Sequence, residues 1–292
     1  MPTTLTGALH QAARGGSAIH YLERASKDSV QTYAQLRADA LRVLGFLQGR
    51  GVGRGDEVVL QLELNRDFIT ALWACLLGGF IPVPLAAGGV DEHRLKVFKV
   101  WPVLNRPHLL CAEGAAAAGL VAFGRAQGLE AVAGQLERRA LSFAEAAAHA
   151  EPGQEQAVTP EDLALIQFSS GSTGEPKGVM VTHHAALVNA TDMITTLRVD
   201  ERDRFLGWMP LTHDFGIIGF HFTPLVAGVP QYQLPTQRFA RHPALWLESA
   251  HAHRATILAS PNFGYLHLLS HYDPESVTHW DLSCVRIIQN GA

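Results

Sequence analysis

Residues Ser169–Val179, SSGSTGEPKGV, have a composition suited to binding an anion. Glycines allow several backbone N–H groups to converge, the hydroxyls add further donors, and Lys177 supplies a positive charge. A charge-assisted hydrogen bond of this kind contributes about 1.5–3 kcal/mol, enough to matter for a triphosphate. The same residue types are common in solvated hairpin turns, so composition alone leaves both interpretations open. The nucleoside-triphosphatase P-loop is excluded, because Gly178 follows Lys177 where that pattern has Ser or Thr.

A second group of polar residues, Thr212-His213-Asp214, is followed by Phe215-Gly216 and comes after an apolar run that predicts a strand. Ligand-binding loops follow the strands of parallel sheets. His213 can orient a carboxylate there, and the glycine permits close approach. A hydrogen-bonded loop with no ligand remains the alternative.

Elements that alternate between helix and strand predict an α/β fold with mostly parallel sheets flanked by helices. Tyr33–Gln48 has apolar residues at helical spacing and a glycine stop. Val58–Leu62 predicts a strand, and Asn65 or Asp67 is a candidate cap for the helix that contains Trp73.

The uncharged run Phe68–Val90 is long enough to suggest a membrane span. Gly78-Gly79 and the prolines Pro82 and Pro84 interrupt it. We therefore predict a buried helix, a glycine stop and a short strand.

The Ala-rich stretch Ala112–Ala150 predicts helices, and the polar, turn-rich stretch Glu151–Asp162 predicts a link. We expect a first α/β subdomain over residues 1–155 and a second over 156–292. The elements expected in the second are a helix over Thr182–Arg198, a strand over Phe205–Met209, a loop over Pro210–Gly219, a helix over Leu245–Arg254, and strands over Thr256–Ala259 and Val285–Gln289.

Composition excludes several classes of protein. The chain has 292 residues, 47% hydrophobic and 17% charged, with a net charge of -4, so it has neither the basic surface of a nucleic-acid-binding protein nor the composition of a disordered chain. Cys75, Cys111 and Cys284 are widely spaced, which favours a reducing cytoplasm over a disulfide framework.

The order of the residues in the Ser169–Val179 segment closely resembles the signature of the adenylate-forming superfamily: acyl-CoA synthetases, fatty acyl-AMP ligases, nonribosomal adenylation domains and luciferases. Two further blocks resemble that family in the same order, Gln31–Leu36 (QTYAQL) and Leu72–Pro84. The resemblance implies the N-terminal domain of an enzyme in which a carboxylate attacks the α-phosphorus of ATP, giving an acyl-adenylate and pyrophosphate.

The resemblance also implies roles for individual residues. Lys177 and His213 are the expected catalytic residues, and Thr173 is the expected contact of the Mg²⁺ that accompanies ATP. The expected ATP-binding residues are Ser169, Ser170, Gly171, Ser172, Thr173, Gly174, Lys177, Asn290, Gly291 and Ala292. The expected residues for the acid are His213, Asp214, Phe215, Gly216, Pro261, Asn262 and Phe263.

Within the family, PLTHDFGIIG at Pro210–Gly219 most resembles the fatty acyl-AMP ligases. An aromatic residue before Asp214, in place of His213, is typical of amino-acid-activating domains. We expect a fatty or other organic acid as substrate and an acyl carrier protein as acceptor. Coenzyme A as acceptor, an amino acid as substrate and a non-catalytic nucleotide-binding domain are the alternatives.

Fifteen histidines raise the question of a metal site. His183-His184 and the pair His251 and His253 lack the helical spacing of a zinc motif, so we expect no dedicated zinc.

The end of the sequence, Asn290-Gly291-Ala292, opens a turn that in the family continues further. We therefore expect a fragment that is inactive in adenylation by itself.

Overall fold

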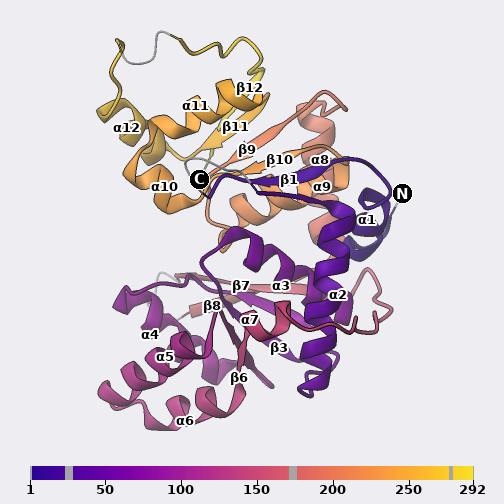
Figure 1. Ribbon diagram of the computed structural model, residues 1–292, viewed down its shortest axis with the longest axis vertical. Helices are drawn as coiled ribbons and strands as arrows, with labels where there is room; N and C mark the ends of the chain where they lie inside the picture. The colour runs from indigo at the N-terminus through magenta and orange to yellow at the C-terminus, as the bar shows by residue number, and fades with distance from the viewer. Residues whose placement is uncertain (1, 24–28, 171–175, 276–278, 292) are drawn as a thin grey trace. The chain divides into compact units, whose positions relative to one another are not determined.

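The computed structural model describes residues 2–23, 29–170, 176–275 and 279–291 (Figure 1). The chain forms two compact units, the first Met1–Gly7 with Gln35–Ala186, the second Ala8–Ala34 with Leu187–Ala292. This division differs from the boundary expected between residues 155 and 156. Residues 156–186 belong to the first unit, and Ala8–Ala34 belongs to the second.

The first unit is built on a parallel sheet with strand order β4-β3-β5-β6. Its strands are β3 (Glu57–Gln61), β4 (Ile81–Pro84), β5 (His108–Cys111) and β6 (Ala140–Ser142), and its helices are α2 (Tyr33–Gly49), α3 (Asn65–Gly78), α4 (Asp91–Val100), η1 (Trp101–Val103), α5 (Gly114–Ala126), α6 (Glu130–Arg139) and α7 (Phe143–Ala147). The antiparallel pair β7 (Leu163–Ser170) and β8 (Pro176–Thr182) completes it, with β7 beside β4.

The apolar run of the first unit is divided as the sequence predicts. Gly79 ends α3 in the left-handed conformation, with φ 65°, and β4 follows. Within the described ranges, no helix has both the length and the apolar composition needed to cross a bilayer. The predicted caps are wrong, because Leu64 precedes the first helical residue, Asn65, and no side chain caps the helix.

The second unit contains a sheet with strand order β12-β11-β9-β10-β1-β2, parallel except for the β1–β2 pair. The strands are β1 (Ala18–Tyr21), β2 (Ser29–Thr32), β9 (Phe205–Gly207), β10 (Gln231–Gln233), β11 (Ile257–Ser260) and β12 (Ile287–Asn290), and the helices are α8 (His183–Leu197), η2 (Phe215–Phe222), α9 (Thr223–Ala227), α10 (Thr236–Arg241), α11 (Ala244–His253) and α12 (Asn262–Ser270). Helices α1 (Leu5–Ala12), α2 and α8 each begin in one unit and continue in the other.

Two apolar clusters cover the two faces of this sheet. Leu206 and Leu258 face Phe239 of α10 and Trp246 of α11, in a cluster that also contains Leu268 of α12. Alternate residues of the same strands, such as Phe205 and Ile257, face Phe220 of η2. This alternation is the period-two pattern of a sheet buried on both faces.

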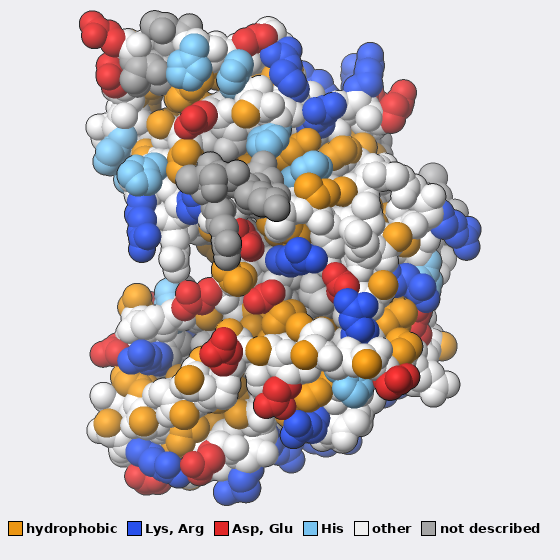
Figure 2. All heavy atoms as spheres, viewed as in Figure 1, with side chains coloured by type: hydrophobic (Ala, Val, Ile, Leu, Met, Phe, Trp, Pro, Cys, Tyr) orange, Lys and Arg blue, Asp and Glu red, His pale blue; other side chains and the backbone are white. Residues whose placement is uncertain are grey.

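Charged side chains of both signs are interspersed among the described residues of the face shown in Figure 2. The mixture agrees with the small net charge of -4.

Candidate active site

The chain leaves β9, β11 and β12 at one edge of the second unit's sheet. These strands are parallel neighbours, with β9 ending at Gly207, β11 at Ser260 and β12 at Asn290. Their carboxyl ends therefore lie along the same edge, where ligands bind in open α/β sheets.

The His213-Asp214-Phe215 turn is fixed by its own polar atoms. The Phe215 backbone N–H points toward Asp214 Oδ1, at 2.7 Å, and His213 Nδ1, at 3.3 Å. His213 Nδ1 and Asp214 Oδ1 are themselves 2.7 Å apart, the distance of a hydrogen bond or ion pair between the two side chains, and both side chains are more than half exposed. Because His213 uses Nδ1 in this turn, Nε2 is the ring atom left to meet a ligand.

Residues 215–222 form a π-helix, where the sequence analysis predicted loop as far as Gly219. The prediction was wrong because glycines at 216 and 219 and a proline at 210 are typical of loops. Gly216 is buried, and a Cβ atom there would lie 2.2 Å from the Pro210 carbonyl oxygen. Gly216, which was expected to contact the acid, instead makes a close backbone contact, and of the two glycines in this segment it is Gly219 that lines the pocket.

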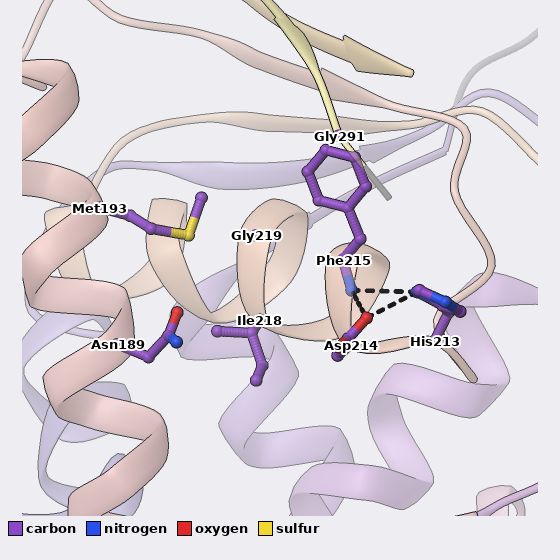
Figure 3. A pocket seen from close by; sticks show the side chains of 8 residues that line it. All are labelled: Asn189, Met193, His213, Asp214, Phe215, Ile218, Gly219 and Gly291. Carbon is purple, nitrogen blue, oxygen red and sulfur yellow. Dashed lines mark hydrogen bonds and ion pairs between the residues drawn. The ribbon is translucent and has the colours of Figure 1, made fainter. Parts of the chain in front are cut away.

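A pocket of about 390 Å³ lies against this turn (Figure 3). Asn189 and Met193 extend toward it from α8, and the Phe215 ring extends toward Gly291. Its lining residues are Asn189, Met193, His213, Asp214, Phe215, Ile218, Gly219 and Gly291. An apolar wall with a few polar groups at one end is typical of a small-molecule site.

Four of these residues were not predicted from the sequence: Asn189, Met193, Ile218 and Gly219. The first two lie on a helix distant in sequence from the His213 turn, and only the tertiary fold brings them there. Of the predicted residues, the structure places His213, Asp214, Phe215 and Gly291 together.

Pro261, Asn262 and Phe263 lie on the same sheet edge but do not line this pocket. The Asn290 side-chain N–H donates to Asn262 Oδ1 at 2.7 Å, which joins the end of β12 to the start of α12. Phe263 is 64% exposed, with its ring edge-on to Trp208.

The serine- and glycine-rich segment is the connection of an antiparallel hairpin in the first unit. Ser169 pairs with Lys177, and Ser170 with Pro176. Lys177 is exposed, while the expected contacts Gly171, Ser172, Thr173 and Gly174 lie outside the described residues, as does Ala292.

Lys96 of α4 contacts β7 near the turn of this hairpin: its ammonium donates to the Phe168 carbonyl at 3.1 Å. Burial lowers the pKa of Lys96, and the nearby Glu92 partly opposes that shift. Phe168 pairs with Gly178, one rung from Lys177.

Histidine side chains gather over the part of the chain that Figure 1 colours orange to yellow (Figure 2). Among the described residues, no three His, Cys, Asp or Glu side chains come together as possible metal ligands.

Comparisons with known proteins identify the family of this chain. The profile of the family described as AMP-binding enzyme matches residues 9–292. A Caulobacter vibrioides protein named provisionally as an acyl-CoA synthetase is 34% identical over 96% of this chain and 48% of its own length. A medium-chain-fatty-acid–[acyl-carrier-protein] ligase of Moorena producens is 28% identical over 97% of this chain and 47% of its own length.

Among solved structures, the adenylation domain of a keto acid-selecting nonribosomal peptide synthetase module, bound to keto acyl adenylate, superposes with a TM-score of 0.89. It is 29% identical and is matched over 100% of this chain and 54% of its own. The chain spans about half the length of the relatives it matches. By its profile match, its relatives and its fold, this chain belongs to the AMP-binding enzyme family.

Proposed function

We propose that the protein carrying this chain activates a carboxylic acid, fatty or a related organic acid, as an acyl-adenylate. One carboxylate oxygen attacks the α-phosphorus of ATP, the bond from that phosphorus to the bridging oxygen breaks, and pyrophosphate leaves. The observation that carries the proposal is the pocket in which the His213-Asp214 turn meets an apolar wall at the carboxyl edge of a parallel sheet.

In the proposed acid pocket, polar and apolar side chains contact different parts of the acid. His213 Nε2 is available to hold a carboxylate oxygen, because Nδ1 already faces the Phe215 N–H. Met193, Phe215 and Ile218 suit an acyl chain. Oδ1 of Asp214 accepts from the Phe215 N–H and holds the start of η2. His213, at the position where amino-acid-activating domains typically carry an aromatic residue, supports an organic acid over an amino acid.

On the ATP side, we assign the phosphates to the hairpin that ends in Lys177. Positioned donors and a cation stabilise the charge that moves onto departing pyrophosphate. Lys177 is the exposed cation there, and Ser169, Ser170, Gly171, Ser172, Thr173 and Gly174 remain the proposed donors. Mg²⁺, bound with ATP near Thr173, would neutralise phosphate charge. Asn290 and Gly291, with Ala292, are proposed to contact the nucleotide.

We propose an acyl carrier protein as the acceptor, since the Moorena producens relative is named a ligase for one. The Caulobacter vibrioides relative favours coenzyme A as the second candidate. Incubating the full-length protein, acid and ATP with either a phosphopantetheinylated carrier or coenzyme A separates them. Carrier acylation supports the first, and rapid acyl-CoA formation contradicts it.

We also propose a cytoplasmic location. In support, the thiols of Cys75 and Cys111 are buried and free, and that of Cys284 is half-buried.

Exchange of pyrophosphate into ATP by the full-length protein tests the role of Lys177. Lys177→Ala should reduce acid-dependent exchange by about 100-fold or more, as when a transition-state donor is lost. Lys99→Ala is the matched control, because Lys99 is also exposed but lies on α4, and it should leave exchange unchanged. Equal exchange by both variants would contradict the assignment of the phosphates to the hairpin.

A further inference from the structure

The π-helix η2 contributes residues to the pocket wall and also packs on the sheet. Phe215, Ile218 and Gly219 line the pocket. Phe220 and His221 are 1% and 0% exposed, and Phe220 packs in one cluster with Phe205 and Ile257 of the sheet. Segments of π-helix are uncommon and occur frequently at functional sites. Any movement of η2 on the sheet therefore moves the wall.

Two buried glutamines on β10 bind the backbone of η2. Gln231 is 0% exposed and Gln233 is 1% exposed. Gln233 Nε2 donates to the Phe220 carbonyl at 2.7 Å and to Gln231 Oε1 at 2.8 Å. Gln231 Nε2 makes a longer contact, 3.4 Å, with the next carbonyl, that of His221. Side chains of the sheet thus hold two successive carbonyls of η2.

Further polar atoms of this cluster are paired as well. The His221 Nδ1–H donates to Gln231 Oε1 at 2.9 Å. Gln231 Nε2 donates to the Tyr33 hydroxyl at 2.9 Å, and that hydroxyl donates to the Val229 carbonyl at 2.9 Å. Buried amides are costly unless they are hydrogen-bonded, and a fully paired network fixes one geometry.

Gly207 of β9 sets how closely η2 approaches the sheet. A Cβ atom at this position would lie 2.8 Å from Phe220 Cγ and 2.9 Å from Phe220 Cβ. The phenylalanine ring and the base of its side chain occupy the space that any other residue would need. Gly207 and Gln233 are register partners on neighbouring strands, so both contacts act on the same part of η2.

We propose that Gln231, Gln233 and Gly207 are positioning residues for the acid pocket: they hold η2 at one depth and rotation on the sheet. The proposal rests on the acid-binding function proposed above. None of the three lines the pocket, so their effect on the acid passes through Phe215, Ile218 and Gly219.

Two variants test the positioning role in the full-length protein. Gln233→Leu removes the hydrogen bond to the Phe220 carbonyl, and Gly207→Ala displaces η2 while leaving every amide in place. Either should raise KM for the acid by about tenfold and change the chain-length preference, while KM for ATP stays within about twofold. Hydrogen exchange of the amides of residues 215–222 should become faster in both.

The matched control is Gln31→Leu, because Gln31 is also buried in this sheet and accepts from the Tyr21 hydroxyl. Gln31→Leu should lower the stability of the protein, but it should change neither the KM for the acid nor the hydrogen exchange of the amides of residues 215–222. Unchanged acid KM and unchanged exchange in Gln233→Leu and Gly207→Ala would overturn the positioning role. If Gln233→Leu does not fold, Gly207→Ala decides alone. If the wild-type protein forms no acyl-adenylate, the proposed function is overturned instead. Hydrogen exchange of residues 215–222 separates the two outcomes, because it reports on η2 whether or not adenylate is formed.

Discussion

The guanidinium of Arg286 holds both carboxylate oxygens of Asp203, with Nε–Oδ1 at 2.7 Å and Nη2–Oδ2 at 2.5 Å. The Asp203 side chain is 2% exposed. Arg286 also donates to the carbonyls of Leu197 and Arg198 at the end of α8. This one side chain therefore fastens the end of α8, the helix that carries Asn189 and Met193, to the residue that precedes β12. The pocket lies at the other end of β12, beside Gly291.

Arg286→Ala should lower the free energy of unfolding by about 2 kcal/mol, between the values of an exposed and a buried ion pair, because it leaves a buried carboxylate without its main partner. Urea denaturation measures the change. Arg202→Ala is the control: its pair with Asp200 has a similar length, 2.5 Å, but the Arg202 side chain is 83% exposed. Equal losses in the two variants would show that Asp203 does not depend on Arg286.

Gly219 leaves space in the pocket that a side chain would fill. A Cβ atom there would lie 3.3 Å from the Phe215 ring and 3.5 Å from Met193 Cε. Gly219→Val should weaken binding of long-chain acids by about tenfold or more relative to short ones, because each buried methylene contributes about 0.8 kcal/mol. Calorimetric titration with acyl-adenylate analogues of increasing length measures this. A uniform loss at every length would contradict the position given to the acyl chain.

His221 makes stability depend on pH. Burial lowers its pKa to about 4, and the hydrogen bond with Gln231 only partly opposes that shift. In the unfolded chain this histidine has an ordinary pKa near 6.5, so as pH falls the unfolded chain binds the proton first. The free energy of unfolding is therefore at its full value above about pH 6.5, and it decreases by about 3 kcal/mol as pH falls toward about 4.

Denaturation at several pH values tests this. In His221→Gln the free energy of unfolding should fall less steeply with decreasing pH, and the change in slope should correspond to at most about one bound proton. His184→Gln, at an exposed position, should leave the slope unchanged. The same slope in wild type and His221→Gln would show that His221 does not titrate as the structure indicates.

Local patterns predicted much of the fold. Apolar spacing gave the helix that begins at Tyr33, and the glycine pair gave the end of α3 at Gly79, because each depends on neighbouring residues. The helix expected over Thr182–Arg198 is α8, His183–Leu197, and the Thr182 hydroxyl accepts from the Ala185 N–H at its start. The position of the His213 turn after a strand was also predicted, since β9 ends a few residues before it.

The long-range part of the site was not predictable from the sequence. Met193 reaches the pocket because α8 lies beside η2, and no local pattern specifies that placement. The π-helix was missed because Gly216 suggests a loop until Gln231 and Gln233 are known to bind its carbonyls. Two glutamines at alternate positions of one strand were the available signal, since they share a face of the sheet.

The transfer of oxygen from the acid to AMP tests the central claim most directly. The full-length protein would be incubated with ATP and a fatty acid labelled with ¹⁸O in its carboxylate, and the AMP released after hydrolysis or transfer would be examined by mass spectrometry. Attack of the carboxylate on the α-phosphorus predicts one ¹⁸O atom in AMP and unlabelled pyrophosphate. Acid-dependent AMP without ¹⁸O, or cleavage to ADP and phosphate, would contradict adenylate formation.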